Sequence, residues 1–213
     1  MMAGLAPRAC RCGKEHPWDT ISVSGEWAPH ALRCFIIGES PGENRAKYFY
    51  NERRKKVAIR TIMLRELGRH GLLDEPTLRA FQKAGFLFDH AIRCLLPPDT
   101  IRRERSLADR YNSPLAQAAT HLNSYLGRAP AVWVMGRIAR NAVAARCAEF
   151  PRDTAEISKP PYPRALPDAP RFFVSRYLLH APANQVPTIF ARLHRFLNHN
   201  AALQCPACIG RLY

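Results

Sequence analysis

The chain has 213 residues, with 32 Lys or Arg against 17 Asp or Glu and a formal net charge of +15 at pH 7. This length suffices for one domain with a sizeable core, and the charge favours a polyanionic partner, nucleic acid before any other. No apolar run reaches the length of a membrane span, and the first residues lack the hydrophobic region of a signal peptide. We therefore expect a cytoplasmic protein, in which seven cysteines argue against a disulfide framework.

Apolar periodicity and Gly/Pro punctuation divide the chain into alternating strands and helices. In chain order we expect an irregular segment at 1–30, a strand at 32–37, a helix at 57–70 ended by Gly71, a helix at 75–83, a strand at 86–92, a helix at 113–127, a strand at 131–135, a helix at 137–148, a proline-rich loop at 151–170, a strand at 172–179, a helix at 186–198 and a tail at 199–213. This order predicts an α/β fold: one domain, 1–213, in which a four-stranded parallel sheet forms the middle of a three-layer α/β/α sandwich.

The first strand runs directly into a tight turn that carries a carboxylate, Gly38-Glu39-Ser40-Pro41-Gly42. Ligands of parallel sheets bind outside the carboxyl ends of the strands, and glycine allows the backbone to approach a flat ligand closely. A second such corner follows the last strand, where His180-Ala181-Pro182-Ala183-Asn184 leads into the final helix. We expect the two corners to face one site.

Four motifs in a fixed order carry a family resemblance. They are Gly-Glu-Ser-Pro-Gly from Gly38, Arg93-Cys94 followed by Pro97-Pro98, Val-Met-Gly-x-x-Ala from Val134, and His-x-Pro-x-Asn from His180. Together they resemble the uracil-DNA glycosylase superfamily, its thermophile-type iron–sulfur branches above all, over roughly residues 32 to 197. The resemblance implies a monomeric DNA repair enzyme that swings a damaged base out of DNA and hydrolyses its N-glycosidic bond, leaving an abasic site.

The resemblance implies catalytic roles for two residues. His180 would stabilise the negative charge that develops on the departing base, and Glu39 would handle the attacking water. Each has a plainer alternative, because a loop histidine is commonly a surface residue and Glu39 is also suited to capping a helix or pairing with Arg45. Gly38, Ser40, Pro41 and Gly42 would form the pocket wall, and an aromatic ring would stack on the base. Of Tyr48, Phe49 and Tyr50, Phe49 is our choice, although all three also suit a core.

The residue that reads the base edge departs from the family pattern. Relatives most often carry Asn there, whereas this chain has His90 preceded by Asp89. A histidine donates or accepts according to its tautomer, so the substrates are expected to extend from uracil to deaminated purines. The alternative is that Asp89 and His90 only cap the end of a strand.

Contacts to the DNA backbone and stack are expected from the loops beside the site. Basic side chains at Arg45, Arg53 and Arg54 would contact phosphates, although a charge run is also commonly only a solvated face. Asn184 would contact substrate or cap the final helix. Gln185 and Val186 are the candidates for a wedge that fills the place of the flipped base.

The cysteines do not complete the iron–sulfur pattern of the relatives. Cys10, Cys12 and Cys94 take the first three positions, but no cysteine lies near Arg110, where the fourth is expected. We therefore expect no iron–sulfur cluster, and no cofactor for catalysis. Cys10 and Cys12 with Cys205 and Cys208 could instead form a structural four-thiolate zinc site, or be free thiols. Cys34 and Cys147 are expected to be small core residues.

Two functions of different classes follow from the sequence. The first is a monofunctional uracil-DNA glycosylase-type hydrolase, which the presence of both Glu39 and His180 favours. The alternative is a catalytically silent nucleic-acid-binding module of the same fold, which the altered Asp89-His90 corner favours.

Overall fold

A computed structural model of the chain describes most of the predicted domain. The described residues are 26–41, 48–54, 56–94, 97–106, 115–116, 119–150, 164–166 and 169–203. Six residues singled out from the sequence lie outside them: Gly42, Arg45, Cys10, Cys12, Cys205 and Cys208.

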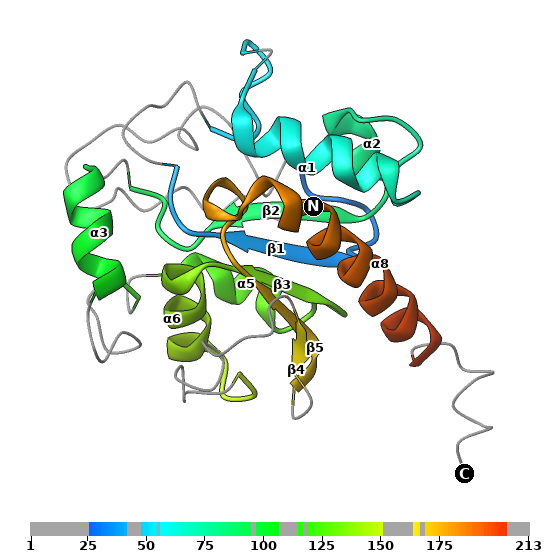
Figure 1. Cartoon of the computed structure of the whole chain (residues 1–213). Coiled ribbons are helices and arrows are strands. Elements are labelled where there is room, and N and C mark those ends of the chain that lie inside the picture. The colour runs from blue at the N-terminus through cyan, green and yellow to red at the C-terminus, as the bar shows by residue number, and fades with distance from the viewer. Residues whose placement is uncertain are drawn as a thin grey trace.

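One twisted sheet forms the centre of the fold (Figure 1). Its strands are β1 (Cys34–Gly38), β2 (Phe86–His90), β3 (Val132–Met135), β4 (Arg164–Leu166) and β5 (Ala169–Ser175), in the spatial order β2-β1-β3-β5-β4. β1 pairs in parallel with β2 and β3, and β3 pairs in parallel with β5. The predicted four-stranded parallel sheet is thus confirmed. The short antiparallel β4 at the edge was not predicted, because 151–170 has a composition typical of a loop.

Helices cover both faces of this sheet (Figure 1). On one side lie α1 (Ala58–Arg69), α2 (Leu78–Lys83) and α8 (Val186–Leu203), and on the other lie α5 (Asn123–Leu126) and α6 (Arg137–Arg146), with α3 (Pro98–Ser106) next to α6. The described residues also form three short 3₁₀ helices: η3 (Thr120–Leu122), η4 (Leu178–His180) and η5 (Ala183–Gln185). The α/β architecture agrees with the sequence prediction. None of the helices in the described ranges is both long enough and apolar enough to cross a membrane.

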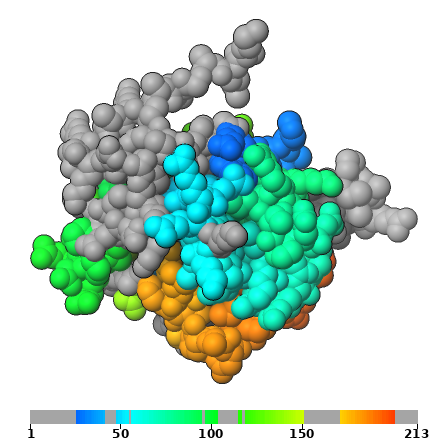
Figure 2. Space-filling view, turned by 90° about the horizontal axis from the view of Figure 1, so that it is seen from above, coloured from blue at the N-terminus to red at the C-terminus, as the bar shows by residue number. Residues whose placement is uncertain are grey.

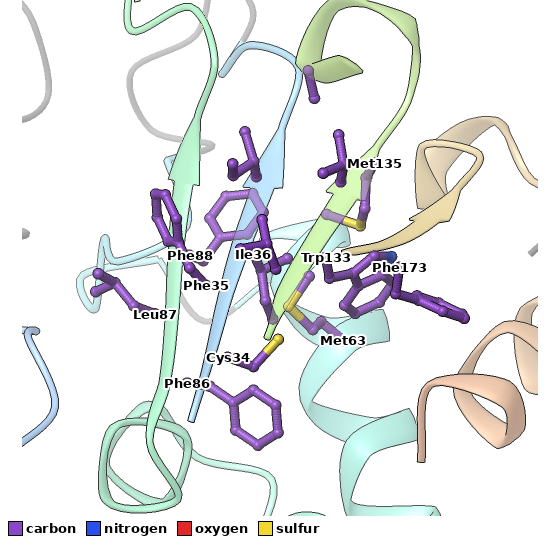
Figure 3. Close-up of a cluster of buried hydrophobic side chains, with 14 of the residues drawn as sticks. Cys34, Phe35, Ile36, Met63, Phe86, Leu87, Phe88, Trp133, Met135 and Phe173 are labelled. Carbon is purple, nitrogen blue, oxygen red and sulfur yellow. The ribbon is translucent and has the colours of Figure 1, made fainter. Parts of the chain in front are cut away.

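The core is built where the strands are buried on both faces. Every residue of β1, β2 and β3 is buried, as expected for a sheet covered on both sides. Figure 3 shows the side chains of these strands packed together, with Met63 of α1 and Phe173 of β5 beside Trp133. The core therefore holds the strands in place and leaves their carboxyl ends to carry the loops.

Several boundaries differ from the prediction. The helix expected over 113–127 is not continuous in its described part: residues 115–116 are helical, Ala119 is not, and η3 and then α5 follow. α3 was missed because Pro97-Pro98 suggests a turn, whereas proline is readily accommodated in the first turn of a helix. The strand expected over 172–179 ends at Ser175, and α8 continues beyond Asn198 to Leu203. The end of α1 agrees, since Gly71 follows it with φ of 67°.

Candidate active site at the carboxyl end of the sheet

The carboxyl ends of the parallel strands bring the sequence-predicted corners to one edge of the sheet. Beyond the last paired residues of β1 and β2, the loops remain joined by the Ala91 N–H, which donates to the Gly38 carbonyl at 2.8 Å, and the Ile92 N–H, which donates to the Glu39 carbonyl at 3.0 Å. The Gly136 N–H likewise donates to the Ser175 carbonyl at 3.0 Å. Loops from all four parallel strands therefore begin from a rigid edge.

Glu39 lies at the amino end of α6. Its Oε1 accepts from the backbone N–H of Arg137 at 3.0 Å and lies 3.5 Å from that of Ile138, and the side chain is only 3% exposed. Unpaired N–H groups and the helix dipole make a helix amino end favourable for a carboxylate. The helix-capping alternative for Glu39 is thus observed, while its action on water stays a prediction.

Gly136 leaves the space that the Glu39 carboxylate occupies. Its φ is 85°, a region that favours glycine, and a Cβ atom built at this position would overlap Glu39 Oε1. A side chain at 136 would therefore be strained and would also displace the carboxylate from α6. The sequence signal for this contact was the glycine directly after a buried strand, but nothing in the sequence identified its partner.

The pocket-wall candidates after Glu39 are buried. Ser40 and Pro41 are both buried, and the Ser40 hydroxyl donates to the Cys94 carbonyl at 3.4 Å. This contact ties the turn after β1 to the segment after β2. The two motifs that stand 54 residues apart in the sequence are thus neighbours in the fold.

The choice of Phe49 as the stacking ring is not supported by its position. Phe49 is fully buried, with its ring centroid 4.4 Å from that of Phe88 and 5.3 Å from that of Phe81. Tyr48 and Tyr50 are also buried, and the Phe88 N–H donates to the Tyr50 hydroxyl at 2.7 Å. The core alternative for these rings describes the observed packing, because an apolar ring gains more from filling the core than from facing water.

Asp89 is engaged in a buried ion pair. Its Oδ2 lies 2.5 Å from an Arg93 guanidinium nitrogen, and its Oδ1 accepts from the His90 N–H at 2.7 Å. Burial raises the pKa of Asp89, but the charges of Arg93 and His121 and these hydrogen bonds bring the pKa below its usual value. The carboxylate is therefore used inside the protein, as the strand-capping alternative expects, and reading of a base by Asp89 is not supported.

His90 is buried without a partner for one ring nitrogen. It is 1% exposed, its ring meets Phe88 edge-on at 4.8 Å, and its carbonyl oxygen lies 2.8 Å from His121 Nε2. Burial lowers the pKa of His90 to about 4, so the ring is neutral at neutral pH. Within the described residues, His90 Nδ1 and the hydroxyl of Tyr48 have no hydrogen-bond partner, and their rings lie 5.7 Å apart. Two buried polar groups on neighbouring rings thus have no hydrogen-bond partner in the described part of this corner.

His180 lies at the surface, in contrast to the buried His90. It is exposed in η4, and its backbone N–H donates to the Tyr177 carbonyl at 2.9 Å. Its ring centroid lies 5.4 Å from that of Tyr177, and a Tyr177 ring carbon lies 3.4 Å from where a Cβ at Gly38 would be. Tyr177, which sequence reasoning missed, thus links the corner after β1 to the corner after β5.

The segment after His180 separates into exposed and buried residues. Asn184 and Gln185 are exposed in η5, whereas Val186 is only 6% exposed at the start of α8. Val186 therefore packs in the core and does not fit the wedge role. Among the described residues, Leu179 is the one large hydrophobic side chain that is exposed, at 46%. The apolar side chain next to His180 that faces solvent is thus Leu179.

The described cysteines and carboxylates form no metal centre. No group of three or more His, Cys, Asp or Glu within the described ranges could hold a metal ion, and the four terminal cysteines lie outside those ranges. Cys34 is a core residue, as predicted, and burial raises the pKa of its thiol to about 12. Cys147 is half-buried beside Arg171, whose guanidinium lies 3.5 Å from its Sγ.

No protein-family model matches the sequence, and no curated protein matches it significantly.

Proposed function

We propose that this protein is a DNA glycosylase of the uracil-DNA glycosylase type, which removes uracil and other deaminated bases from DNA. The observation that carries the proposal is the link from Gly38 through Tyr177 to His180, because it brings the two motif-bearing corners together at the carboxyl end of a parallel sheet. The net charge of +15 supports a nucleic-acid substrate.

The proposed reaction breaks the bond between the sugar C1′ and the base nitrogen. Water supplies the hydroxyl group that C1′ gains, and the base leaves as an anion that then takes up a proton. Because negative charge develops on the base, a donor aimed at its carbonyl oxygen lowers the barrier. His180 is assigned this role, since its exposed ring is accessible to a base that has left the stack.

Glu39 is assigned a smaller role than His180. Its carboxylate is held at the amino end of α6, so it can position water only from that fixed place. Bond breaking by dissociation also requires little of the water beyond position. Replacement of Glu39 by Gln is therefore expected to slow base release less than loss of the His180 imidazole.

In this proposal Leu179, and not Val186, is the apolar wedge residue. An apolar side chain inserted into the stack fills the place of the flipped base, and it must be exposed before DNA arrives. Leu179 meets this requirement and Val186 does not. Gln185, which is exposed, remains the polar candidate.

A catalytically silent nucleic-acid-binding module is the second candidate. It is favoured by the use of Glu39 as a helix cap and of Asp89 as an ion-pair partner, since both carboxylates then have complete structural roles. Such a module would bind DNA through its basic face and leave the base in place.

The discriminating experiment is incubation with a labelled uracil-containing oligonucleotide followed by alkali, which cleaves only at abasic sites. We expect cleavage by the native protein, a loss of more than about tenfold in single-turnover rate for His180→Ala, and little change in DNA affinity. His199→Ala is the matched control, because His199 is an exposed histidine of α8. DNA binding without any cleavage, over uracil, hypoxanthine and xanthine, would establish the silent module instead.

A further inference from the structure

Arg60 is a buried arginine that no functional motif includes. It lies in the first turn of α1 and is 6% exposed. One guanidinium nitrogen, Nη1, donates to the carbonyl oxygens of Phe49 at 3.1 Å and Asn51 at 2.9 Å, and the other, Nη2, donates to the carbonyl oxygen of Arg54. A single side chain thus holds three backbone carbonyls of the segment that leads into α1.

That segment is the basic turn, which we define as residues 49–54 together with Lys56. Its own backbone closes two consecutive turns, from the Asn51 N–H to the Tyr48 carbonyl at 3.1 Å and from the Arg54 N–H to the Asn51 carbonyl at 3.2 Å. Because these carbonyls face Arg60, the side chains at 53 and 54 lie outside, and Arg53, Arg54 and Lys56 are all exposed.

Only arginine can hold the turn in this way. Its planar guanidinium offers five N–H donors in a fixed fork, whereas a lysine ammonium is a single point with three donors. Burial lowers the pKa of Arg60, while the neighbouring charge of Glu52 opposes that shift. Arginine still keeps its proton in proteins, so the charge-assisted bonds to the carbonyls remain.

The basic turn lies on the same face as the corner after β5. α1 contacts η4, and Figure 2 shows the cyan segment of the turn and the start of α1 against the orange segment that carries η4 and η5. DNA whose flipped base reaches His180 would therefore extend its backbone over this face. Phosphates are spaced regularly along that backbone, and arginine side chains presented by a rigid loop match them.

We propose that Arg60 is a positioning residue for nucleic-acid binding: it shapes the basic turn so that Arg53, Arg54 and Lys56 contact the phosphate backbone. The inference rests on the proposed function for the identity of the polyanion. Arg60 itself does not touch DNA, and its effect passes through the turn.

The test measures the affinity for an undamaged labelled duplex by fluorescence anisotropy at several KCl concentrations. Removal of one side chain that neutralises a phosphate lowers the slope of log K against log salt by about 0.9. We expect Arg53→Ala/Arg54→Ala to reduce the slope by up to about 2, and Arg60→Lys to reduce it by about 1 or more. Adding Arg60→Lys to the double variant should then cost less affinity than it costs the native protein, because Lys56 is the only one of the three positioned charges that remains.

Arg171→Lys is the matched control. Arg171 also holds backbone carbonyls, those of Leu126 at 2.6 Å and Ala129 at 3.2 Å, but it directly precedes Phe172, where β5 begins to pair with β3 at the opposite, amino end of the parallel strands. Thermal melting of each variant verifies folding. We expect Arg171→Lys to lower the melting temperature and leave the salt slope unchanged.

Three outcomes would overturn the inference. They are a native slope in Arg60→Lys, an equal loss of slope in Arg171→Lys, or a native slope in the Arg53/Arg54 double variant, which decides the matter even when Arg60→Lys does not fold. Base release is not needed for this measurement. If the protein does not release uracil but its salt slope falls in the variants of the basic turn, the glycosylase proposal alone is refuted. If it releases uracil but the salt slope does not depend on the basic turn, the role of Arg60 alone is refuted.

Discussion

The carboxyl end of β2 and the turn after β5 each carry a histidine that the motifs assign to a functional site, yet the two lie in opposite environments. His90 is buried beside the Asp89–Arg93 pair, whereas His180 is exposed beside Tyr177. The difference shows that polar residues at strand ends of this sheet serve two purposes. Asp89 and His90 at the end of β2 are buried within the edge of the sheet, whereas His180, Asn184 and Gln185 after β5 are exposed.

The largest expected effect tests whether the β2 corner is structural. Arg93→Ala leaves the fully buried Asp89 carboxylate without its cation, which typically costs about 3–5 kcal/mol. The free energy of unfolding, measured in urea, should fall by this amount, and the pKa of Asp89 should rise. The control is Arg102→Ala, because the Arg102–Asp99 pair is exposed and should contribute less than about 1 kcal/mol. Equal losses for the two variants would contradict a structural role for the β2 corner.

The second prediction concerns the stability of the same corner in acid. The folded pKa of His90 is about 4 against 6.5 for an ordinary histidine, so between these values the unfolded chain binds a proton that the folded chain does not. Stability is therefore complete above pH 6.5 and falls as the pH decreases toward 4, by roughly 3 kcal/mol for His90 alone. His121, whose pKa burial also lowers, adds an effect of the same sign. Asp89 acts only at lower pH, since its folded pKa lies below 3.8.

The measurement is the free energy of unfolding at pH 7 and at pH 4.5 for the native protein and for His90→Asn. The variant should lose clearly less stability on acidification, because it has no ring to protonate in the unfolded state. Parallel pH curves for the two proteins would show that His90 is protonated in the fold, and that the β2 corner is open to water.

Sequence reasoning succeeded where a local pattern fixes the structure, and failed where a distant partner does. The apolar runs of β1, β2 and β3 and the periodicity of α1 predict their elements because burial on a sheet or helix face leaves a regular trace. The contact of Glu39 with the amino end of α6 joins residues 98 positions apart, and only the fold determines that they meet. The packing of Phe49 could not be predicted for the same reason, since its partners Phe81 and Phe88 lie more than thirty residues away.

The third prediction tests the place of Glu39 against Gly136 and the amino end of α6. This place lies between the β2 corner and the β5 side of the sheet. Gly136→Ala combines an unfavourable positive φ with a Cβ in the place of the carboxylate, so we expect a loss on the order of 2 kcal/mol in unfolding free energy. Gly127→Ala is the control, because nothing lies within 4 Å of its added Cβ and its φ is −70°. A native stability for Gly136→Ala would mean that Glu39 moves freely from α6, and that its action on water is not limited to that fixed place.

The smallest expected effect concerns the β5 side, and it depends on the proposed function. Leu179→Ala should slow uracil release from duplex DNA about fivefold, which corresponds to about 1 kcal/mol, because the gap left by the flipped base is no longer filled. Release from a single-stranded oligonucleotide should be unchanged, since no stack has to be held open there. Leu179→Met keeps the bulk of the side chain and should retain the native rate on both substrates. Equal slowing on both substrates would show that Leu179 supports the position of His180, and that the apolar side chain exposed beside it does not enter the DNA stack.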